Sequence, residues 1–398
     1  MWIFDGKIDL AQGIVIEVLL RLPAAALCRF KVVSKEWHSM ISSAYFRGRY
    51  ASTGRTTSSF RFLSVLKYRC CKPKSDHVLE HELLMDLHSG ALKIPTKSSW
   101  NFLAKDQADH HRNLRMKSYK VLGVSNGLVL CWCYRRGHQI ICNPVTSQCV
   151  VLPRCNGVDW SYWGFLTEVS TDEVFMTSYT VVAFVPLRFQ FQVFLSKTGE
   201  WKVYDFARGT HINPQGGYLK AATELHGILH WPHSTNGKIL AYDPHRNPHA
   251  PRLIALPHDH QPLLCKSATT MFGTHQGQYL RYLESDNQRL SVWVLTDYGI
   301  GDNWWLQHRV DYDHIPDMVR NVHCIIHPIS LHPFDPDIVY LGCDYVLSSY
   351  NMRERKWELV KSFHRIPREA FSYWSRAITL VIPPFPHSIP SSPRMNKS

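Results

Sequence analysis

Hydrophobic and polar positions follow two different patterns along the chain, and the change falls near residue 50. Before it, apolar residues recur at i, i+3, i+4 and i+7, the spacing of one face of a helix. They are Val15, Val18, Leu19 and Leu22. Pro23 follows directly and is expected to end this first helix, because proline cannot continue a helical hydrogen-bond ladder.

Two more short helices are expected before residue 50. Leu27 and Phe30 continue the apolar face beyond the alanine run 24–26. Ser34 is a suitable N-cap, and it precedes an apolar series in which Trp37 and Ile41 lie four residues apart. The pattern predicts three short helices joined by sharp turns.

From about residue 60 the chain breaks into short β-type runs divided by glycine, asparagine and proline. The small polar stretch before them, within residues 51–60, is interpreted as a linker. A unit of strand, turn and second strand then recurs roughly every 50 residues, a period typical of propeller blades. Five copies are clear, at 141–153, 194–204, 240–257, 294–306 and 349–360, and a weaker one spans 84–95.

These repeats predict an α+β multidomain chain, with the three-helix module followed by an all-β propeller of six blades. The apolar run 377–382 is expected to pair with an early blade and close the ring, which removes exposed sheet edges. A β-sandwich or barrel with chance similarity among its hairpins is the alternative. Residues 386–398 are rich in proline and serine and are expected to be disordered.

Composition limits the partners and the cell compartment. The formal charge is +13, so nucleic acid must be considered, but no basic run longer than two residues stands beside a known binding motif. The eleven cysteines form no Cys-x-x-Cys pair, and neighbours such as Cys131 and Cys133 suit buried thiols better than bridges. No apolar window is long enough for a membrane span and no signal peptide is evident, so a cytoplasmic or nuclear location is expected.

Catalytic chemistry finds little support in the sequence, and no cofactor or metal is expected. The metalloprotease pattern His-Glu-x-x-His is missing. His258-Asp-His260 and His110-His111 are interpreted as solvated loop histidines, and Asp335-Pro-Asp337 as a turn.

Residues 10–41 resemble the F-box. The resemblance rests on an Arg21-Leu22-Pro23 run, an Arg29-Phe30 pair and a Lys35-x-Trp37 pair at the family's spacing. The chain departs from that pattern at Ala11, where the family usually has proline.

The rest of the chain resembles plant F-box-associated β-propellers. This part rests on Gly123-x-Ser-Asn-Gly-Leu, Ile141-Cys-Asn-Pro-x-Thr and His226-Gly-x-Leu-His-Trp, in that order. The resemblance implies an F-box over residues 1–50, a linker over 51–60, a substrate-binding propeller over 61–385 and a tail over 386–398.

The resemblance also implies a function. An F-box protein docks on a Skp-type adaptor and, through it, on a cullin and RING protein, and presents a protein substrate for ubiquitination without performing catalysis. The residues expected at the adaptor surface are Leu10, Ile14, Val18, Leu19, Leu22, Pro23, Leu27, Phe30, Val33 and Trp37. For Trp37 the internal core is an equal alternative.

The substrate and the residues that bind it are not named by the sequence. Trp160-Ser-Tyr-Trp163 and Trp304-Trp305 are candidates, with blade packing as the stronger interpretation for both. A non-ligase scaffold or a nucleic-acid-associated factor is the alternative function.

Overall fold

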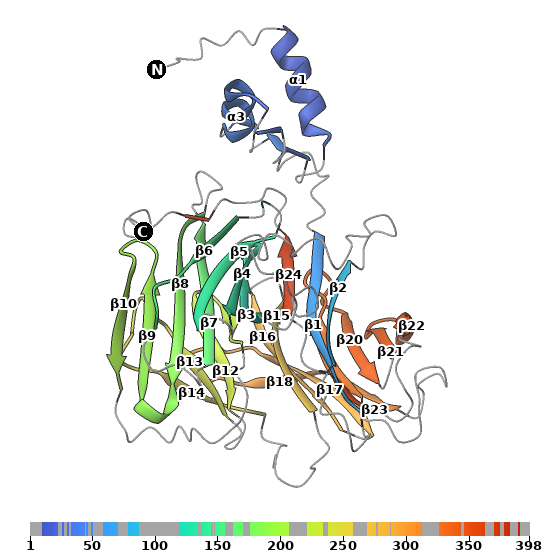
Figure 1. Ribbon diagram of the computed structural model, residues 1–398. Helices are drawn as coiled ribbons and strands as arrows, with labels where there is room; N and C mark the ends of the chain where they lie inside the picture. Colours follow the sequence, from blue (N-terminus) through green and yellow to red (C-terminus); the bar gives the residue numbers. More distant parts are fainter. Residues whose placement is uncertain are drawn as a thin grey trace.

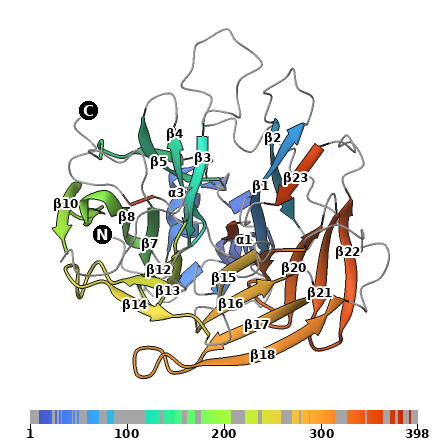
Figure 2. The ribbon, with the colours of Figure 1, turned by 90° about the horizontal axis from the view of Figure 1, so that it is seen from below.

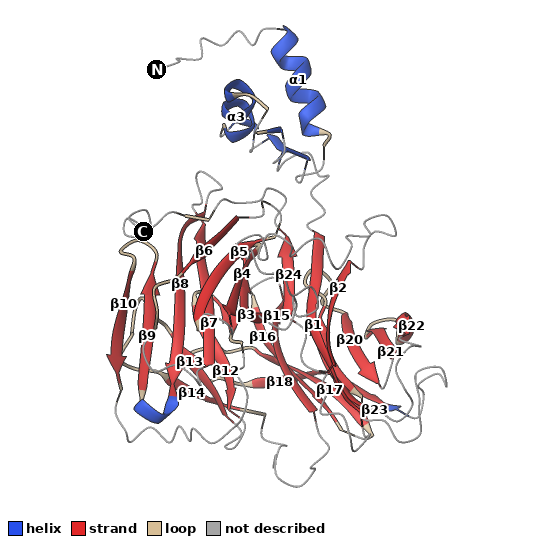
Figure 3. Ribbon diagram, in the orientation of Figure 1, coloured by secondary structure: helices blue, strands red, loops and turns tan. Residues whose placement is uncertain are grey.

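The computed structural model describes residues 10–50, 59–70, 79–86, 119–312, 326–362, 370–382 and 389–390, apart from loop segments within those ranges. The helices lie beyond one end of a ring of β-sheets (Figure 1). Viewed along the ring, the sheets surround a common centre (Figure 2). Almost all of the regular structure after residue 58 is strand, and the single-turn helix η1 (Pro186–Arg188) joins β8 to β9 (Figure 3).

Two N-terminal helices are bounded in the structure, α1 (Leu10–Leu20) and α3 (Lys35–Ser42). Between them the chain makes a helical turn, in which the Lys31 amide donates to the Leu27 carbonyl oxygen at 3.1 Å. The predicted second helix is not confirmed as an element, because part of it lies outside the described residues. Ser34 caps α3 as predicted, accepting a hydrogen bond from the Trp37 amide at 3.1 Å.

Five antiparallel four-stranded sheets follow one another along the chain. Blade 1 comprises β3 (Tyr119–Ser125), β4 (Leu128–Cys133), β5 (His138–Asn143) and β6 (Gln148–Val151). Blade 2 comprises β7 (Tyr162–Val169), β8 (Met176–Val185), β9 (Gln190–Leu195) and β10 (Glu200–Asp205). Blade 3 comprises β11 (Thr223–Leu225), β12 (Ile228–His233), β13 (Lys238–Tyr242) and β14 (Arg252–Ala255).

Blade 4 comprises β15 (Thr269–His275), β16 (Tyr279–Ser285), β17 (Arg289–Leu295) and β18 (Trp304–Asp311). Blade 5 comprises β19 (His327–Leu331), β20 (Ile338–Cys343), β21 (Val346–Asn351) and β22 (Lys356–Ser362). The first strands of neighbouring blades contact one another. The five clear sequence repeats are the last two strands of these five blades, so the all-β propeller prediction is confirmed.

The sixth sheet has a different build and joins the two ends of the propeller. It contains β1 (Ser59–Cys70), β2 (Leu79–Asp86), β23 (Ala370–Trp374) and β24 (Ile378–Ile382). β2 pairs with one edge of β1, and β23 and β24 follow each other along the opposite edge. This closing sheet is therefore three strands wide.

The prediction of six blades is wrong, because the described residues form five complete blades and one closing sheet. The weak repeat at 84–95 was counted as a sixth blade. It covers only the end of β2 and residues outside the described part of the chain. The run 377–382 does close the ring as predicted. It forms β24, which pairs with the start of β1 and contacts β3.

The cores of the propeller lie between blades. Each of four apolar clusters draws its residues from two neighbouring blades, from blades 1 and 2 through to blades 4 and 5. Successive residues of one strand serve different clusters, as Val181 and Val182 of β8 do. Because side chains alternate across a strand, a strand buried on both faces is apolar at nearly every position.

Close approach between blades 2 and 3 requires a glycine. A Cβ atom on Gly164 of β7 would overlap Cδ1 of Leu229 in β12. Real Cβ atoms do not approach other heavy atoms this closely, so Leu229 occupies the space that a side chain at position 164 would need.

Cysteine chemistry follows the prediction in blade 1 and departs from it in blade 5. Cys131 and Cys133 are buried free thiols, as predicted. Cys343, at the end of β20, is disulfide-bonded, and its partner side chain lies outside those that the structure describes. Ile389, in the segment expected to be disordered, packs against the core between blades 1 and 2, so the expectation of disorder fails at this residue.

Candidate adaptor-binding surface and propeller platform

The helical module has its own apolar core. Its buried members are Ile16, Leu19, Leu20, Leu27, Ile41, Phe46 and Tyr50. The buried face of α1 is thus shifted by one residue from the predicted apolar stripe. Because α1 is apolar on nearly every side, the spacing of its apolar residues does not determine which face is buried. Phe46 and Tyr50 were missed by the sequence interpretation, which ended the module's apolar pattern at Ile41.

Tyr50 ties the end of the module to its beginning. Its hydroxyl donates to the Leu22 carbonyl oxygen at 2.8 Å, across 28 residues of chain. One residue earlier, Arg49 forms a 2.6 Å ion pair with Glu17 of α1. The module is therefore held by contacts that extend to residue 50.

The predicted adaptor residues separate into groups by burial. Leu19 and Leu27 are fully buried in the module core, and Leu22, Phe30 and Trp37 are half-buried against it. Three residues are largely exposed, with exposed fractions of 60% for Ile14, 55% for Val18 and 63% for Val33. Pro23 and the side chain of Leu10 lie outside the described residues.

Trp37 belongs partly to the core. Its ring lies 5.2 Å from that of Phe30, centroid to centroid, at an interplanar angle of 49°. Both rings pack on the module's buried cluster while keeping part of their surface open. Ile14 and Val18 differ from them, because they lie four residues apart on one side of α1 and leave most of their surface to solvent.

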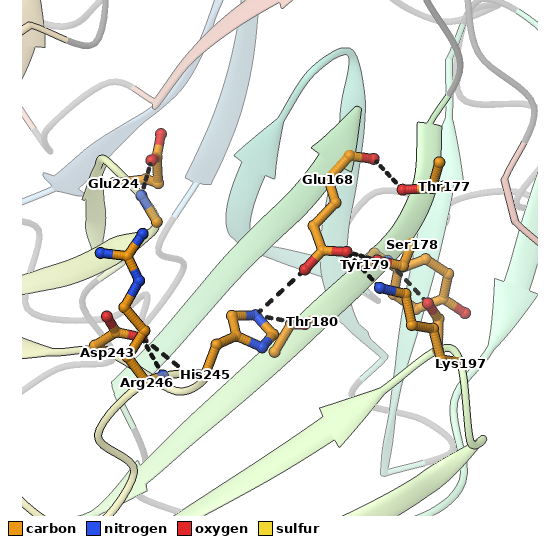
Figure 4. A network of polar contacts seen from close by, with 12 residues as sticks. Glu168, Thr177, Ser178, Tyr179, Thr180, Lys197, Glu224, Asp243, His245 and Arg246 are labelled. Carbon is orange, nitrogen blue, oxygen red and sulfur yellow. Dashed lines mark hydrogen bonds and ion pairs between the residues drawn. The ribbon is translucent and has the colours of Figure 1, made fainter. Parts of the chain in front are cut away.

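A polar network lies between blades 2 and 3 (Figure 4). The Glu168 carboxylate accepts hydrogen bonds from Lys197 Nζ at 2.7 Å and from Ser178 Oγ at 2.5 Å. His245 Nε2 lies 3.9 Å from the same carboxylate and 3.3 Å from Thr180 Oγ1. The bonds from Lys197 and then Ser178 lower the pKa of Glu168, so this carboxylate is charged at neutral pH.

A second polar cluster joins blades 3 and 4. His230 is buried, with Nδ1 3.2 Å from the Thr223 carbonyl oxygen and Nε2 2.7 Å from the Tyr298 hydroxyl. A carbonyl oxygen only accepts, so Nδ1 carries the proton and Nε2 accepts from Tyr298. Arg252 lies over the Tyr298 ring and pairs with Asp302, which fixes the β17–β18 loop against blade 3.

The tryptophans proposed for substrate binding occupy different positions. Trp163 is buried in the core between blades 1 and 2, and Trp160 lies outside the described residues. Trp304 is half-buried against the core between blades 3 and 4. Trp305 is 60% exposed on the outermost strand of blade 4. Among the described members of these two pairs, Trp305 alone presents most of its ring to solvent.

The candidate catalytic residues form no reactive arrangement in the described part of the chain. Asp335 is a turn residue, as predicted, and accepts from the Asp337 amide at 2.9 Å. No group of three potential metal ligands was found among the described residues, and the histidine pairs at 110–111 and 258–260 lie outside them. In the same described part, no helix is long and apolar enough to cross a membrane.

Residues 123–127 also fit the Gly-x-Ser-x-Gly spacing of serine hydrolases, which the sequence argument against catalysis overlooked. A nucleophile elbow joins a strand to a helix. Here Ser125 ends β3, and the positive φ angles of Asn126 and Gly127 make a hairpin turn into β4. Ser125 Oγ is hydrogen-bonded to Thr167 Oγ1 at 2.8 Å, so the motif is a turn and not an elbow.

Comparison with known proteins agrees with both parts of the chain. The F-box domain family model matches residues 9–48, and the model described as "F-box protein At3g26010-like, beta-propeller" matches residues 88–377. Putative F-box/kelch-repeat protein At4g22430 of Arabidopsis thaliana is 28% identical over 88% of this chain and 80% of its own length. F-box protein At3g26010 of the same plant is 26% identical over 88% of this chain and 79% of its own length. The chain therefore belongs to the At3g26010-like F-box proteins, with an F-box domain followed by a β-propeller.

Proposed function

We propose that this protein is the substrate receptor of an SCF-type ubiquitin ligase. The F-box would bind a Skp-type adaptor and, through it, a cullin and RING protein, while the propeller presents a protein substrate. The observation that carries the proposal is an F-box that leaves Ile14, Val18 and Val33 exposed, although the module has an apolar core of its own. Exposed apolar side chains gathered on a small module are typical of a binding surface.

The burial pattern refines the proposed adaptor surface. Ile14 and Val18 on α1, with Val33 before α3, are the residues best placed for direct contact. Leu19 and Leu27 would act indirectly, since they hold the module together and are closed to a partner. Leu22, Phe30 and Trp37 would both support the core and contact the adaptor, because each packs against the core and keeps part of its surface exposed.

The propeller would act as a non-catalytic platform. Tethering a substrate near the ubiquitin-loaded enzyme raises the effective concentration of its lysines, so this chain needs no reactive residue of its own. We propose a cytoplasmic or nuclear location, where the other ligase subunits and soluble substrates would meet it. The domain boundaries proposed from the sequence, with the F-box to residue 50 and the propeller from about residue 60, suit this division of labour.

The test is binding of the purified full-length chain to a Skp-type adaptor. Replacing both Ile14 and Val18 by aspartate should weaken adaptor binding at least tenfold, because buried apolar anchors can each contribute about 2 kcal/mol. Val203→Asp is the matched control. Val203 is 53% exposed on β10, close to the 55% of Val18, but lies in the propeller.

The thermal unfolding of all variants should match that of the wild type, because the substituted side chains are mostly exposed. Full adaptor affinity in the Ile14→Asp, Val18→Asp variant would reject the proposed surface. If the wild-type chain itself does not bind the adaptor, the ligase role fails.

A nucleic-acid-associated role is the second candidate, favoured by the formal charge of +13. It predicts binding to RNA or DNA that weakens steeply as salt is raised, because counterions released from phosphates drive such binding. Filter binding of the full chain at two salt concentrations distinguishes the two functions.

A further inference from the structure

One face of blade 1 carries four cysteines. Cys131 and Cys133 lie on β4, Cys142 on β5 and Cys149 on β6. The strand registers place all four on the face opposite the core shared with blade 2, because Cys131 pairs with Ile140 and Cys142 pairs with Cys149. None of these four cysteines forms a disulfide in the structure.

Cys142 and Cys149 face each other directly across the β5–β6 pair. The Leu152 amide donates to the Gln139 carbonyl oxygen at 2.9 Å, which identifies that pair as a hydrogen-bonded one. Hydrogen-bonded and non-hydrogen-bonded pairs alternate along an antiparallel ladder. Cys142 lies three residues after Gln139 on β5, an odd number of steps along the alternating ladder. The Cys142–Cys149 pair is therefore a non-hydrogen-bonded one.

That position is suited to a bond between the two sulfurs. Cα atoms of a non-hydrogen-bonded pair lie about 4.5 Å apart, the closest approach in the ladder. Disulfides span Cα separations of about 4.4–6.8 Å. No backbone movement of the hairpin is needed to bring the two cysteines into range.

The two thiols differ in access, which assigns their roles. Cys149 is exposed on the outermost strand, whereas Cys142 is fully buried. Burial, a hydrogen bond with Cys131 and the charges of Cys131 and Cys149 raise the pKa of Cys142. A soluble oxidant therefore meets Cys149 first, and Cys142 is placed to react second.

We propose that Cys149 and Cys142 are a reversible oxidation site, at which a peroxide produces a cross-strand disulfide. The Cys149 thiol releases its proton, and the thiolate attacks one peroxide oxygen as the O–O bond breaks. A sulfenic acid forms, and the departing hydroxide takes up the released proton as the first water. The Cys142 sulfur then attacks the Cys149 sulfur, and the S–O bond breaks as the S–S bond forms. The departing hydroxide takes the Cys142 proton as a second water, so two thiols lose two electrons and peroxide is reduced to two waters.

The consequence is a covalent tie on the outer rim of blade 1. β6 is the last strand of its sheet, and the structure pairs it only with β5 among the described strands. Oxidation would fasten this edge to the strand beside it, and a thiol reductant would release it. The inference does not depend on the proposed ligase function.

Peptide mapping of the intact protein tests the proposal. Trypsin releases both cysteines on one peptide, residues 137–154, while Cys131 and Cys133 lie on another, residues 121–135. After hydrogen peroxide treatment and alkylation, we expect peptide 137–154 to lose two hydrogens and carry no alkyl group. Dithiothreitol should restore both thiols, and alkylation at Cys149 should fall at least tenfold on oxidation.

Three variants sharpen the result. Cys149→Ser and Cys142→Ser should each abolish the internal disulfide, and the exposed position of Cys149 makes the first a mild substitution. Cys155→Ser is the matched control, because Cys155 lies just beyond β6 and bonds instead to Gln192 of β9. A cross-link between the two peptides would show a disulfide to Cys131 or Cys133 of β4 and overturn the assignment. Sulfinic acid at Cys149 with no disulfide would overturn it as well.

Discussion

The indole nitrogen of Trp304 donates a hydrogen bond to the Ala255 carbonyl oxygen, 2.7 Å away, and so joins the first residue of β18 to the last residue of β14. The same relationship recurs two interfaces earlier, between blades 1 and 2, where Trp201 of β10 donates to the Pro153 carbonyl oxygen at 2.9 Å. In each case a tryptophan on the outer strand of one blade binds the end of the preceding blade. This contact accounts for the tryptophan that follows the turn in these two copies of the sequence repeat.

The adjacent pair Trp304 and Trp305 provides a test of this contact. Trp304→Phe removes the hydrogen bond to Ala255 and should lower the free energy of unfolding by about 1–2 kcal/mol. Trp305→Phe, at a ring that is 60% exposed, should stay within about 0.5 kcal/mol of wild type. Urea unfolding of both variants measures the difference, and equal effects would contradict the role assigned to Trp304.

The propeller could be predicted from the sequence because its repeats coincide with real hairpins. The turn in each clear copy connects the third and fourth strands of one blade, so turn residues and flanking apolar runs marked all five complete blades. The closing sheet was harder to predict, because β2, β23 and β24 all pair with β1 and come from both ends of the propeller sequence. A linear repeat does not encode that arrangement, and the blade count was overestimated.

The adaptor surface was only partly predictable. Almost every residue of α1 from Ile14 to Leu20 is apolar, so the sequence identifies a helix with two apolar faces but not which face turns inward. The inward face depends on Phe46 and Tyr50, which close the core from a later segment. Their contribution is tertiary and leaves no signal in the spacing of α1.

The contact between Gly164 and Leu229 predicts coupled effects on stability. Gly164→Ala forces a methyl group against Leu229 and should cost about 1–3 kcal/mol. Adding Leu229→Val withdraws the Cδ atoms and should recover part of that cost. Chemical unfolding of both single variants and the double variant should reveal coupling of at least about 0.5 kcal/mol. Additive effects would show that the two blades separate to accommodate the methyl group.

The cap of α3 makes a separate prediction for the F-box. Ser34→Ala removes the side-chain acceptor of the Trp37 amide and should destabilise the helix by about 1 kcal/mol, whereas Ser34→Asp keeps an acceptor and should not. Ser39→Ala is the control, since Ser39 is an exposed residue within the same helix. Amide hydrogen exchange should accelerate across α3 in Ser34→Ala alone, and unchanged exchange there would contradict the capping role.

Buried His230 predicts how stability depends on pH. Burial lowers its pKa from 6.5 to about 4 in the native protein. Between these values the unfolded chain binds a proton that the folded chain does not, so stability rises with pH across this window and is lost as pH falls through it. The full loss is about 3 kcal/mol. We expect His230→Gln to be less stable than wild type at pH 7 and to lose less stability on acidification to pH 4.5.

Tyr298→Phe provides the control for this prediction. It removes the hydroxyl that donates to His230 Nε2 but leaves the titrating ring buried between blades 3 and 4. Its unfolding free energy should therefore be lower than that of the wild type at both pH values while still falling on acidification. Urea unfolding at pH 7 and pH 4.5 measures all three proteins. If wild type and His230→Gln lose equal stability over this interval, another group controls the acid response and the buried histidine does not.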